Sequence, residues 1–359
     1  MPPDADIAVV GAGIVGAATA RALGTQAGSV VLLEQFALGH TGGSSHGSSR
    51  IFRLNYPDER FVRLAQAADT AWRELEVERG IRVIERLGAL DLGSAAAATG
   101  RALAACGVRH ETLSAPEVME RWPLRLEPDE TAVFQSDGGF THAARAHAAL
   151  LDCARESGIE VRASTPVRSL TLGRRSVELE LDQSTLTVSA VVITAGAWAS
   201  VLLAPVGIDL PVVPTRETVV YLEAAGVESV PPLIDYARLP ARGAGGITRT
   251  GQAAYALPAP DVGLKAGLHH SGPVADPDEG GAPDESVMRW VVEWAQSRYV
   301  HVREPRATET CLYTSTADEG FVLERHGRIV VGSACSGHGF KFAPIVGRTL
   351  AALGREALG

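Results

Sequence analysis

An apolar run from residue 7 to residue 10 leads directly into Gly11-Ala12-Gly13-Ile14-Val15-Gly16 and then into an alanine-rich segment. The run favours a strand that is buried on both faces, and the alanine-rich segment is typical of a helix. Gly11 allows a tight turn, Gly13 allows a pyrophosphate to approach the backbone, and Gly16 allows the helix to pack closely on the strand. Because the start of a helix offers free N–H groups to phosphates, this segment predicts a dinucleotide-binding strand-turn-helix.

The residues that follow strengthen this interpretation. The glycine pattern alone is a weak indication, because 38 of the 359 residues are glycine. A second apolar strand is predicted from Ser29 to Leu33, and Glu34 follows it at the distance at which dinucleotide-binding folds carry an acid. A carboxylate there can accept hydrogen bonds from ribose hydroxyls and would repel a 2′-phosphate. The alternative is a solvated residue at the end of a strand.

The overall composition limits the class of protein. At 359 residues the chain is longer than one ordinary domain, and we expect two. A hydrophobic content of 46% and a charged content of 21% are typical of a soluble globular protein. The net charge of -9 argues against nucleic acid or a membrane surface as a partner. No apolar run reaches the ~18 residues of a membrane span.

The cysteines and the first residues indicate the cellular compartment of the protein. Cys106, Cys153, Cys311 and Cys335 show no C-x-x-C spacing, so we expect no disulfide framework and no metal site. No basic leader precedes the first predicted strand, which argues against a secretory signal. We therefore expect a cytoplasmic protein. Cys106 and Cys153 lie in helical patterns and are interpreted as small core residues.

The order of predicted elements indicates a discontinuous domain. Ala190–Thr194 and Arg328–Gly332 are further apolar strands, and a helix is predicted over about Pro344–Leu358. Over Pro211–Pro305, strand-like pieces separated by proline and glycine favour an antiparallel sheet. The predicted fold is α/β of mixed α+β character, with a Rossmann-like domain and a discontinuous substrate domain built on an antiparallel sheet. We expect the first domain to comprise residues 1–82, 140–212 and 306–359, and the second residues 83–139 and 213–305.

Two stretches of small residues are candidate ligand-binding loops. Residues 39–50 hold almost no large side chain, so their backbone can lie against a flat or charged ligand; a flexible surface linker is the alternative. Ala195-Gly196-Ala197-Trp198 follows a strand at its carboxyl end, where open α/β sheets bind ligands. Arg50 and Arg53 are three residues apart, and on a helical turn they would share a face.

Two late motifs make the pattern specific. They are Thr310-Cys311-Leu312-Tyr313-Thr314 and Ser336-Gly337-His338-Gly339-Phe340-Lys341-Phe342. Together with the glycine-rich turn, His46-Gly47-x-x-Arg50-x-x-Arg53, residues 192–198 and Gly263-Leu264-Lys265, they resemble the monomeric sarcosine oxidase and N-methyltryptophan oxidase family of the D-amino-acid-oxidase-like flavoproteins. The resemblance runs in order from residue 6 to about residue 350. It implies FAD as the cofactor of the first domain and a monomeric enzyme that oxidises CH–NH donors with O2.

The resemblance implies roles at the substrate for several residues. Arg53 and Lys341 would hold the substrate carboxylate, for which the planar fork of arginine is suited. Lys265 would lie over the flavin and activate O2, since a fixed cation stabilises the superoxide that forms first. On its position alone, a lysine in a strand is expected to face solvent. The residues that match substrate-contacting positions are Tyr255, His269 and Tyr313, with His269 also a candidate general base.

The resemblance also implies how the cofactor is held. Cys311 would carry the flavin through a thioether to the 8α-methyl carbon, which requires a thiolate; a buried structural thiol is the alternative. The loop from Gly337 to Lys341 would present N–H groups to flavin carbonyls that gain negative charge on reduction. Arg50 would lie near the flavin, with a structural salt bridge as the alternative. The expected cofactor-binding residues are Gly11, Gly13, Ile14, Val15, Gly16, Glu34, Gln35, Ser44, Ser45, His46, Arg50, Ile51, Val167, Ala195, Gly196, Trp198, Cys311, Gly337, His338, Gly339, Phe340 and Lys341.

The implied reaction is oxidation of a secondary amino acid, N-methyl or cyclic, by hydride transfer to flavin N5. It gives an imine, and reoxidation by O2 yields hydrogen peroxide. Ser48, Ser49 and Leu268 depart from residues common in the family, which favours a pocket altered for a larger or cyclic substrate. The alternatives are a D-amino-acid or glycine oxidase with non-covalent FAD, a nicotinamide dehydrogenase, and a flavin-binding protein without oxidase activity.

Overall fold

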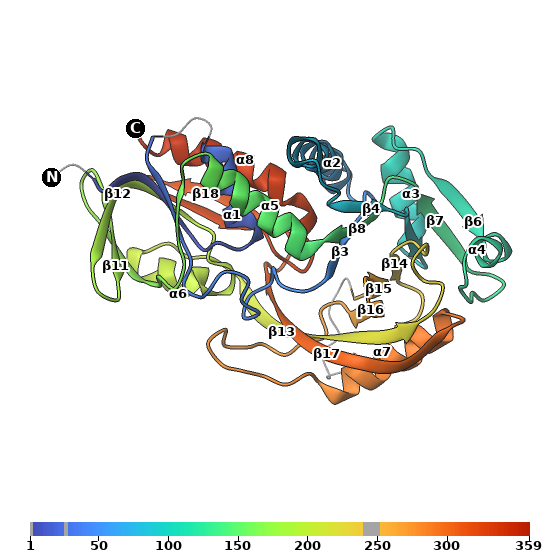
Figure 1. Ribbon diagram of the computed structural model, residues 1–359. Coiled ribbons are helices and arrows are strands. Elements are labelled where there is room, and N and C mark those ends of the chain that lie inside the picture. The colour runs from blue at the N-terminus through green and yellow to red at the C-terminus, as the bar shows by residue number, and fades with distance from the viewer. Residues whose placement is uncertain (1–2, 25–27, 240–251) are drawn as a thin grey trace. The chain divides into compact units, whose positions relative to one another are not determined.

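The computed structural model describes residues 3–24, 28–239 and 252–359, which form two compact units (Figure 1). Unit 1 comprises Met1–His46, Ala144–Pro214 and Leu312–Gly359, and unit 2 comprises Gly47–Ala143 and Thr215–Cys311. Each unit is therefore assembled from segments that are distant in the sequence. The predicted mixed α/β fold class is confirmed.

The border between the units differs from the expected domain boundaries. The sequence assigns residues 47–82, 140–143 and 306–311 to the nucleotide-binding domain, whereas the structure holds them in unit 2. A small antiparallel sheet is one reason, because β3 (Ser49–Phe52) pairs with β8 (Gly139–His142), which also pairs with β4 (Ile84–Arg86). These strands hold the segment after residue 46 to its own unit.

A sheet with a parallel centre organises unit 1. Its strand order is β10-β11-β12-β1-β2-β9, and β19 and β18 extend it from β12. β1 (Ala5–Val10) runs parallel to β12 (Thr185–Ile193) on one side and to β2 (Val30–Leu33) on the other, and β19 (Ile329–Ser333) is parallel to β12. The remaining strands are β9 (Glu160–Arg162), β10 (Val167–Leu172), β11 (Val177–Leu181) and β18 (Val322–His326). β10 and β11 form an antiparallel hairpin.

Helices cover this sheet because its central strands are apolar on both faces. They are α1 (Ile14–Gly24), α5 (Ala143–Glu156), α6 (Ala199–Leu203) and α8 (Ala343–Glu356), with short 3-10 helices η1 (Gly196–Trp198), η2 (Ala204–Val206) and η3 (Gly339–Phe342). α1 and α8 lie side by side in Figure 1, and a Cβ on Gly347 of α8 would come within 2.5 Å of the Ala18 backbone. The small residues of both helices thus allow their close packing.

A largely antiparallel sheet organises unit 2, in the order β17-β13-β16-β15-β14-β5-β7-β6. Its strands are β5 (Ala89–Leu92), β6 (Glu111–Ser114), β7 (Thr131–Gln135), β13 (Val213–Ala224), β14 (Leu233–Asp235), β15 (Ala254–Ala259), β16 (Gly263–Leu268) and β17 (Val302–Ser315). β14 and β5 are a parallel pair. Alternate residues of β16, namely Leu264, Ala266 and Leu268, are buried in one core with Val287 and Val291 of the helix that follows.

Side chains cap the start of helices in unit 2. The helices of this unit are α2 (Glu59–Arg79), α3 (Ala96–Ala105), α4 (Ala115–Arg121) and α7 (Glu285–Arg298). α4 starts with a capping box, in which Glu117 accepts a hydrogen bond from the Ser114 N–H at 2.7 Å. Asp284 caps α7 by accepting from the N–H groups of Ser286 and Val287.

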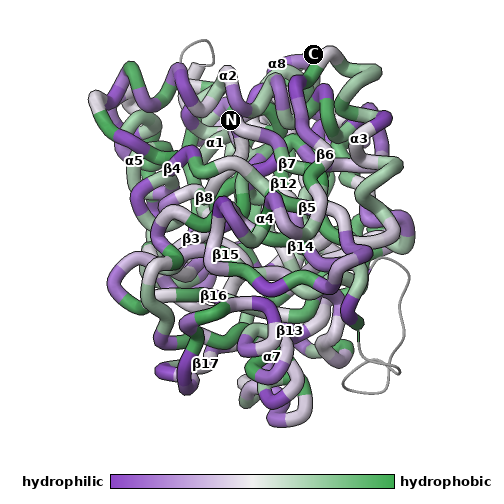
Figure 2. Tube along the Cα trace, turned by 90° about the vertical axis from the view of Figure 1, so that its right-hand side faces the viewer, coloured by the Kyte–Doolittle hydropathy of each residue, from purple (hydrophilic) through white to green (hydrophobic). Residues whose placement is uncertain are grey.

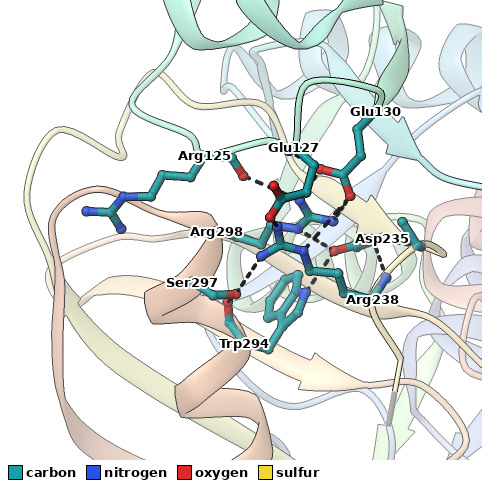
Figure 3. Close-up of polar contacts among 9 residues, drawn as sticks. Arg125, Glu127, Glu130, Asp235, Arg238, Trp294, Ser297 and Arg298 are labelled. Atoms are coloured by element: carbon teal, nitrogen blue, oxygen red, sulfur yellow. Dashed lines mark hydrogen bonds and ion pairs between the residues drawn. The ribbon is translucent and has the colours of Figure 1, made fainter. Parts of the chain in front are cut away.

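A buried ionic network fixes the end of α7 in unit 2 (Figure 3). The side chain of Arg298 is 0% exposed and donates to Asp235 at 2.7 Å and to both carboxylate oxygens of Glu130 at 2.5 and 2.6 Å. Trp294 Nε1 donates to the same Asp235 oxygen at 2.8 Å. At the rim, Arg238 donates to Glu127 at 2.5 Å. The network ties α7 to the end of β14 and to the segment before β7.

Hydrophobic and hydrophilic residues alternate in short stretches along the chain (Figure 2). Alternation of this kind is expected for strands and helices that bury one face. Among the described residues, no helix combines the length and the apolar character needed to cross a membrane.

Candidate active site

The glycine-rich turn of unit 1 has the geometry that a dinucleotide requires. Gly11 has a φ of +97°, and a Cβ on it would lie 2.6 Å from the Thr194 carbonyl oxygen. A Cβ on Gly16 would lie 1.8 Å from the Gly11 carbonyl oxygen, so only glycine allows α1 to start this close to β1. α1 begins at Ile14 with Val15 next, which leaves the N–H groups of the helix start directly after the turn.

Glu34 follows β2 and faces this turn. The residue is 5% exposed, and its carboxylate accepts hydrogen bonds from the N–H groups of Ala12 at 2.9 Å and Phe36 at 3.0 Å. These contacts exclude a solvated strand end. Each carboxylate oxygen has a second lone pair, so Glu34 can also accept a hydrogen bond from a ribose hydroxyl. Gln35, the next expected contact, is half-buried.

The loop of small residues is tied to the same turn. Ser45 Oγ accepts a hydrogen bond from the Ile14 N–H at 2.9 Å. Ser44 Oγ donates to the Leu312 carbonyl at 2.5 Å, and His46 Nδ1 lies 2.8 Å from a carbonyl oxygen of its own loop. These contacts argue against a flexible surface linker, and they place the loop beside the start of α1.

The carboxyl end of β12 supplies further expected cofactor contacts in unit 1. Ala195 and Gly196 follow the strand directly, and Gly196 has a φ of +53°. Trp198 packs edge-on against Phe36, with ring centroids 5.7 Å apart. Val167 is the first residue of β10 and is half-buried. The glycines, the acid and the helix start directly after the turn together fit an adenine dinucleotide.

The loop from Ser333 to Lys341 forms a tight turn that depends on glycine. A Cβ on Gly339 would lie 1.7 Å from a carbonyl oxygen of the same loop. The N–H groups of His338 and Gly339 donate to the Cys335 carbonyl at 2.9 and 2.8 Å. The turn itself uses these two N–H groups. The expected contact between this loop and the flavin carbonyls stays a prediction.

Lys341 is a buried lysine. The residue is 4% exposed, and its Nζ donates to the His338 carbonyl at 2.8 Å. An exposed lysine at a helix start is thereby excluded. Tyr313 of the same unit is also buried, at 8% exposure. Burial of an amine and a phenol is expected where they face a ligand or a packed interior rather than water.

Arg50 and Arg53 do not share a face, which corrects the expectation of a helical turn. Residues 49–52 form β3, because Ile51 and Phe52 favour a strand and pair with Phe140 and Gly139 of β8. Arg50 lies within β3 and its Nη1 approaches Gly47, whereas Arg53 follows the last residue of β3 and pairs with Asp91. The two arginines therefore have different neighbours within unit 2.

Arg53 forms a buried ion pair with Asp91, an acid that the sequence did not single out. Arg53 Nη1 lies 3.1 Å from Asp91 Oδ2, and Asn55 Nδ2 donates to Asp91 Oδ1 at 3.2 Å. The Asp91 side chain is 0% exposed and that of Arg53 is 12% exposed. Burial raises the pKa of Asp91 to about 6, although Arg53 and Asn55 oppose this rise. The guanidinium also lies 4.6 Å from the centroid of the Tyr56 ring.

Lys265 lies on β16 and is buried, at 4% exposure, so the expectation of a solvent-facing lysine is excluded. In the sheet it stands between Tyr221 of β13 and Leu257 of β15. Its Nζ lies 3.4 Å from the Ser49 carbonyl oxygen and 3.5 Å from Glu309 Oε1. Burial lowers the pKa of Lys265 to about 7, because a charge is poorly solvated in the interior.

Gly47 is a site residue that the motif contained but that we did not assign. A Cβ on Gly47 would lie 2.9 Å from Arg50 Nη1, 3.2 Å from Lys265 Nζ and 3.3 Å from Glu309 Oε1, and its φ is +104°. Three charged groups thus converge on a position where any side chain would collide with them. Glu309 and its partner Tyr221 were also missed, because their side chains approach Lys265 only through the pairing of distant strands.

The expected pocket residues of the antiparallel sheet are divided between its two faces. Tyr255 pairs with Gly267, and a Cβ on Gly267 would lie 2.5 Å from the Tyr255 hydroxyl. Gly267 and Lys265 are two residues apart, so Tyr255 and Lys265 share one face. Leu268 lies on the other face in the apolar core, which corrects the expectation that it shapes the pocket. His269 follows β16 and lies against His270, with ring centroids 4.0 Å apart.

Cys311 lies inside β17 rather than at a strand end. The strand continues to Ser315, and Cys311 is 9% exposed. Glu309 and Cys311 are two residues apart and therefore share a face of the strand. The covalent attachment expected at this thiol stays a prediction.

The site residues expected from the sequence are divided between the two units. Unit 2 holds Arg50, Ile51, Arg53, Tyr255, Lys265, His269 and Cys311, and unit 1 holds the rest. One signal in the sequence was missed. Among 33 lysines and arginines, the only lysines are Lys265 and Lys341. Arginine supplies every other cation, so lysine at these two buried positions indicates a specific need for a compact amine.

Known proteins are similar in sequence to this chain over nearly its whole length. A family model described as FAD dependent oxidoreductase matches residues 6–353. Peroxisomal sarcosine oxidase of Homo sapiens is 33% identical over 364 residues, which cover 96% of this chain and 90% of that protein. N-methyl-L-tryptophan oxidase of Salmonella agona is 30% identical over 365 residues, which cover 98% of this chain and 95% of that protein. These relatives are amino acid oxidases and support oxidation of a CH–NH donor.

Solved structures agree with the fold. NikD, an unusual amino acid oxidase essential for nikkomycin biosynthesis, matches with a TM-score of 0.87 and 26% identity, covering 98% of this chain and 94% of that chain. Glycine oxidase from Geobacillus kaustophilus has the same fold, with a TM-score of 0.81 at 21% identity over 99% of this chain and 95% of that one. With its dinucleotide turn, its buried lysines and these relatives, the chain belongs to the FAD dependent oxidoreductase family.

Proposed function

We propose that the protein oxidises a secondary amino acid, N-methyl or cyclic, to an imine, with O2 as the final acceptor and hydrogen peroxide as a product. The observation that carries this proposal is the buried Lys265 amine, held among Ser49, Glu309 and Tyr221. When bound, FAD supplies the acceptor for the substrate hydride and returns the electrons to O2. A cation fixed in a poorly solvated site stabilises the negative charge that O2 acquires.

The chain's own residues would hold FAD and the substrate as follows. The turn at Gly11 and the carboxylate of Glu34 would hold the adenosine diphosphate part. Arg53 and Lys341 would hold the substrate carboxylate, and Tyr255 would contact the substrate on the face of the sheet that carries Lys265. The covalent thioether at Cys311, a monomeric state and a cytoplasmic location belong to the same proposal.

The substrate amine must be neutral before it can lose a hydride. Positive charge from Arg53, Lys341 and Lys265 would favour loss of the amine proton, by ~1.4 kcal/mol for each unit by which the amine pKa falls. No general base is then required, and His269 is assigned to substrate contact.

The substrate class is tested by reducing the purified yellow enzyme without oxygen. We expect N-methyl and cyclic secondary amino acids to bleach the flavin absorbance, and D-amino acids and glycine to bleach it at least tenfold more slowly. Faster bleaching by D-amino acids or glycine would instead identify a deaminating oxidase of primary amines. Retained colour with every amine would contradict the proposal.

A further inference from the structure

Glu309 is an acid in the Lys265 surroundings for which the proposed reaction has no stated use. It lies on β17, two residues before Cys311, and its side chain is 30% exposed. Its Oε1 lies 3.5 Å from Lys265 Nζ and accepts a hydrogen bond from the Tyr221 hydroxyl at 2.6 Å. One carboxylate oxygen therefore links the amine of one strand to the phenol of another.

Tyr221 contacts both members of the Lys265–Glu309 pair. It is the direct partner of Lys265 in the pairing of β13 with β16, and Lys265 Nζ lies 5.4 Å from the centroid of its ring. Its hydroxyl reaches past the amine to Glu309. The tyrosine thus restrains the direction of the carboxylate, while Gly47 leaves room for the amine and the acid to meet.

The charges around Lys265 act in opposite directions. Burial and the nearby Arg50 favour the neutral amine, whereas Glu309 and an ionised Cys311 favour the ammonium. A thioether at Cys311 carries no charge, so in the proposed holoenzyme that contribution is absent. Glu309 is then the acid that opposes burial and Arg50 within unit 2.

We propose that Glu309 is a positioning residue that keeps Lys265 protonated and fixes its amine in place, with Tyr221 orienting the Glu309 carboxylate. This inference rests on the proposed function, in which the Lys265 cation promotes the reaction with O2. The protonation of the Lys265 amine then depends on the neighbouring Glu309 carboxylate. Arginine does not offer this dependence, because it stays charged at any pH that a protein tolerates.

The titration of Lys265 measures this directly, because the chain holds only two lysines. In holoenzyme labelled with [ε-13C]lysine, NMR should show two side-chain signals, assigned with Lys341→Arg. In Glu309→Gln the Lys265 titration should move to lower pH by about one unit or more. Tyr221→Phe keeps the charge but frees the carboxylate, so a smaller shift in the same direction is expected.

The matched control is Glu304→Gln, which removes an exposed acid from the same strand. It should leave the Lys265 titration unchanged. If Glu309→Gln and Tyr221→Phe both retain FAD and titrate like the wild type, Glu309 does not hold the charge of Lys265. If Glu304→Gln shifts the titration as much as Glu309→Gln, the effect is one of overall charge and the inference also fails.

Rapid mixing of the reduced enzyme with oxygenated buffer separates this inference from the proposed function. Reoxidation should slow as pH rises through the Lys265 pKa, and in Glu309→Gln this fall should begin at lower pH, with a loss of about tenfold near pH 8. Lys265→Met should react slowly at every pH. Normal reoxidation in Lys265→Met would refute the role of Lys265, while the NMR titration would still decide the role of Glu309.

Discussion

Arg53 and Lys265 of unit 2 are each paired with an acid, and the two pairs differ in how strongly the acid is buried. Asp91 has no exposed side-chain surface beside Arg53, whereas the Glu309 side chain is 30% exposed beside Lys265. Complete burial disfavours the charged form of Asp91, whereas the Glu309 carboxylate keeps part of its surface in water. How far the positive charge of each cation is neutralised therefore depends on its acidic partner.

Asp91 should make the binding of carboxylates pH dependent. The pKa of Asp91 is raised by burial to about 6. As pH falls through this value Asp91 becomes neutral, and Arg53 is left with an uncompensated charge that attracts a carboxylate more strongly. We expect the Kd of a small carboxylate such as methoxyacetate to fall by about three- to tenfold between about pH 7 and about pH 5.

The variant Asp91→Asn isolates this effect. It should bind the carboxylate tightly across the whole range, and flavin absorbance or calorimetry would measure its Kd. Asp152→Asn, which alters a half-exposed acid of α5, should keep the wild-type pH dependence. The same pH dependence in Asp91→Asn as in the wild type would show that another group titrates.

At the scale of single elements, the sequence predicted the central strands of unit 1 and the glycine-rich turn, where the signal is local. The capping box at Ser114 and the hairpin of β10 and β11 are set by residues close in the chain. The prediction of a helical turn from Arg50 to Arg53 was wrong. A three-residue spacing suits a helix, but pairing with β8 makes residues 49–52 a strand. The partner strand lies about ninety residues away in the sequence, and no local pattern contains that information.

Gly47 should be intolerant of any side chain. Its φ of +104° disfavours other residues, and a Cβ would lie 2.9 Å from Arg50 Nη1 and 3.2 Å from Lys265 Nζ. We expect Gly47→Ala to lower the free energy of unfolding by about 1–3 kcal/mol and to slow the reaction with O2. Gly39→Ala is the control, since its φ is +83° and nothing lies within 4 Å of its Cβ. Equal losses of O2 reactivity in both variants would attribute the effect to backbone strain.

Arg298 should be essential for the attachment of α7. Replacing it by methionine leaves the fully buried Asp235 carboxylate without its cation, and it leaves Glu130 with only Arg238, whose Nε lies 4.0 Å from Glu130 Oε1. Breaking a buried ion pair in this way costs about 3–5 kcal/mol. Denaturant unfolding should show this loss for Arg298→Met and almost none for Arg289→Met, which alters an exposed arginine of the same helix. A loss below about 1 kcal/mol would mean that water replaces the ion pair.

At the scale of the whole molecule, the order of motifs predicted the family, the cofactor and the fold class, and not the border between the units. The glycine turn, the loop after β2 and the late glycine loop each follow a strand of the sheet in unit 1. Their chemistry can be read from the sequence because each is one short segment. Asp91, Glu309 and Tyr221 could not be found in this way, because residues distant in the sequence bring them next to Arg53 and Lys265.

The covalent link between FAD and the chain is the remaining expectation that concerns the whole molecule. Cys311 is the last residue of unit 2, and Leu312 begins the last segment of unit 1, so a thioether there would attach the cofactor where the chain passes from one unit to the other. A linked flavin cannot dissociate when the protein unfolds. We therefore expect acid-precipitated wild-type protein to stay yellow, and the flavin fluorescence to stay with the chain on a denaturing gel.

Cys311→Ser should release all of its flavin on acid precipitation, because a hydroxyl is a far weaker nucleophile than a thiolate. Cys335→Ser is the matched control. Cys335 Sγ accepts a hydrogen bond from the Thr314 N–H at 3.4 Å, so it lies near the same strand without being the expected link. It should keep the flavin bound through denaturation. Release of flavin from the wild type would exclude the thioether, whereas release from Cys335→Ser with retention in Cys311→Ser would assign the link to the other cysteine.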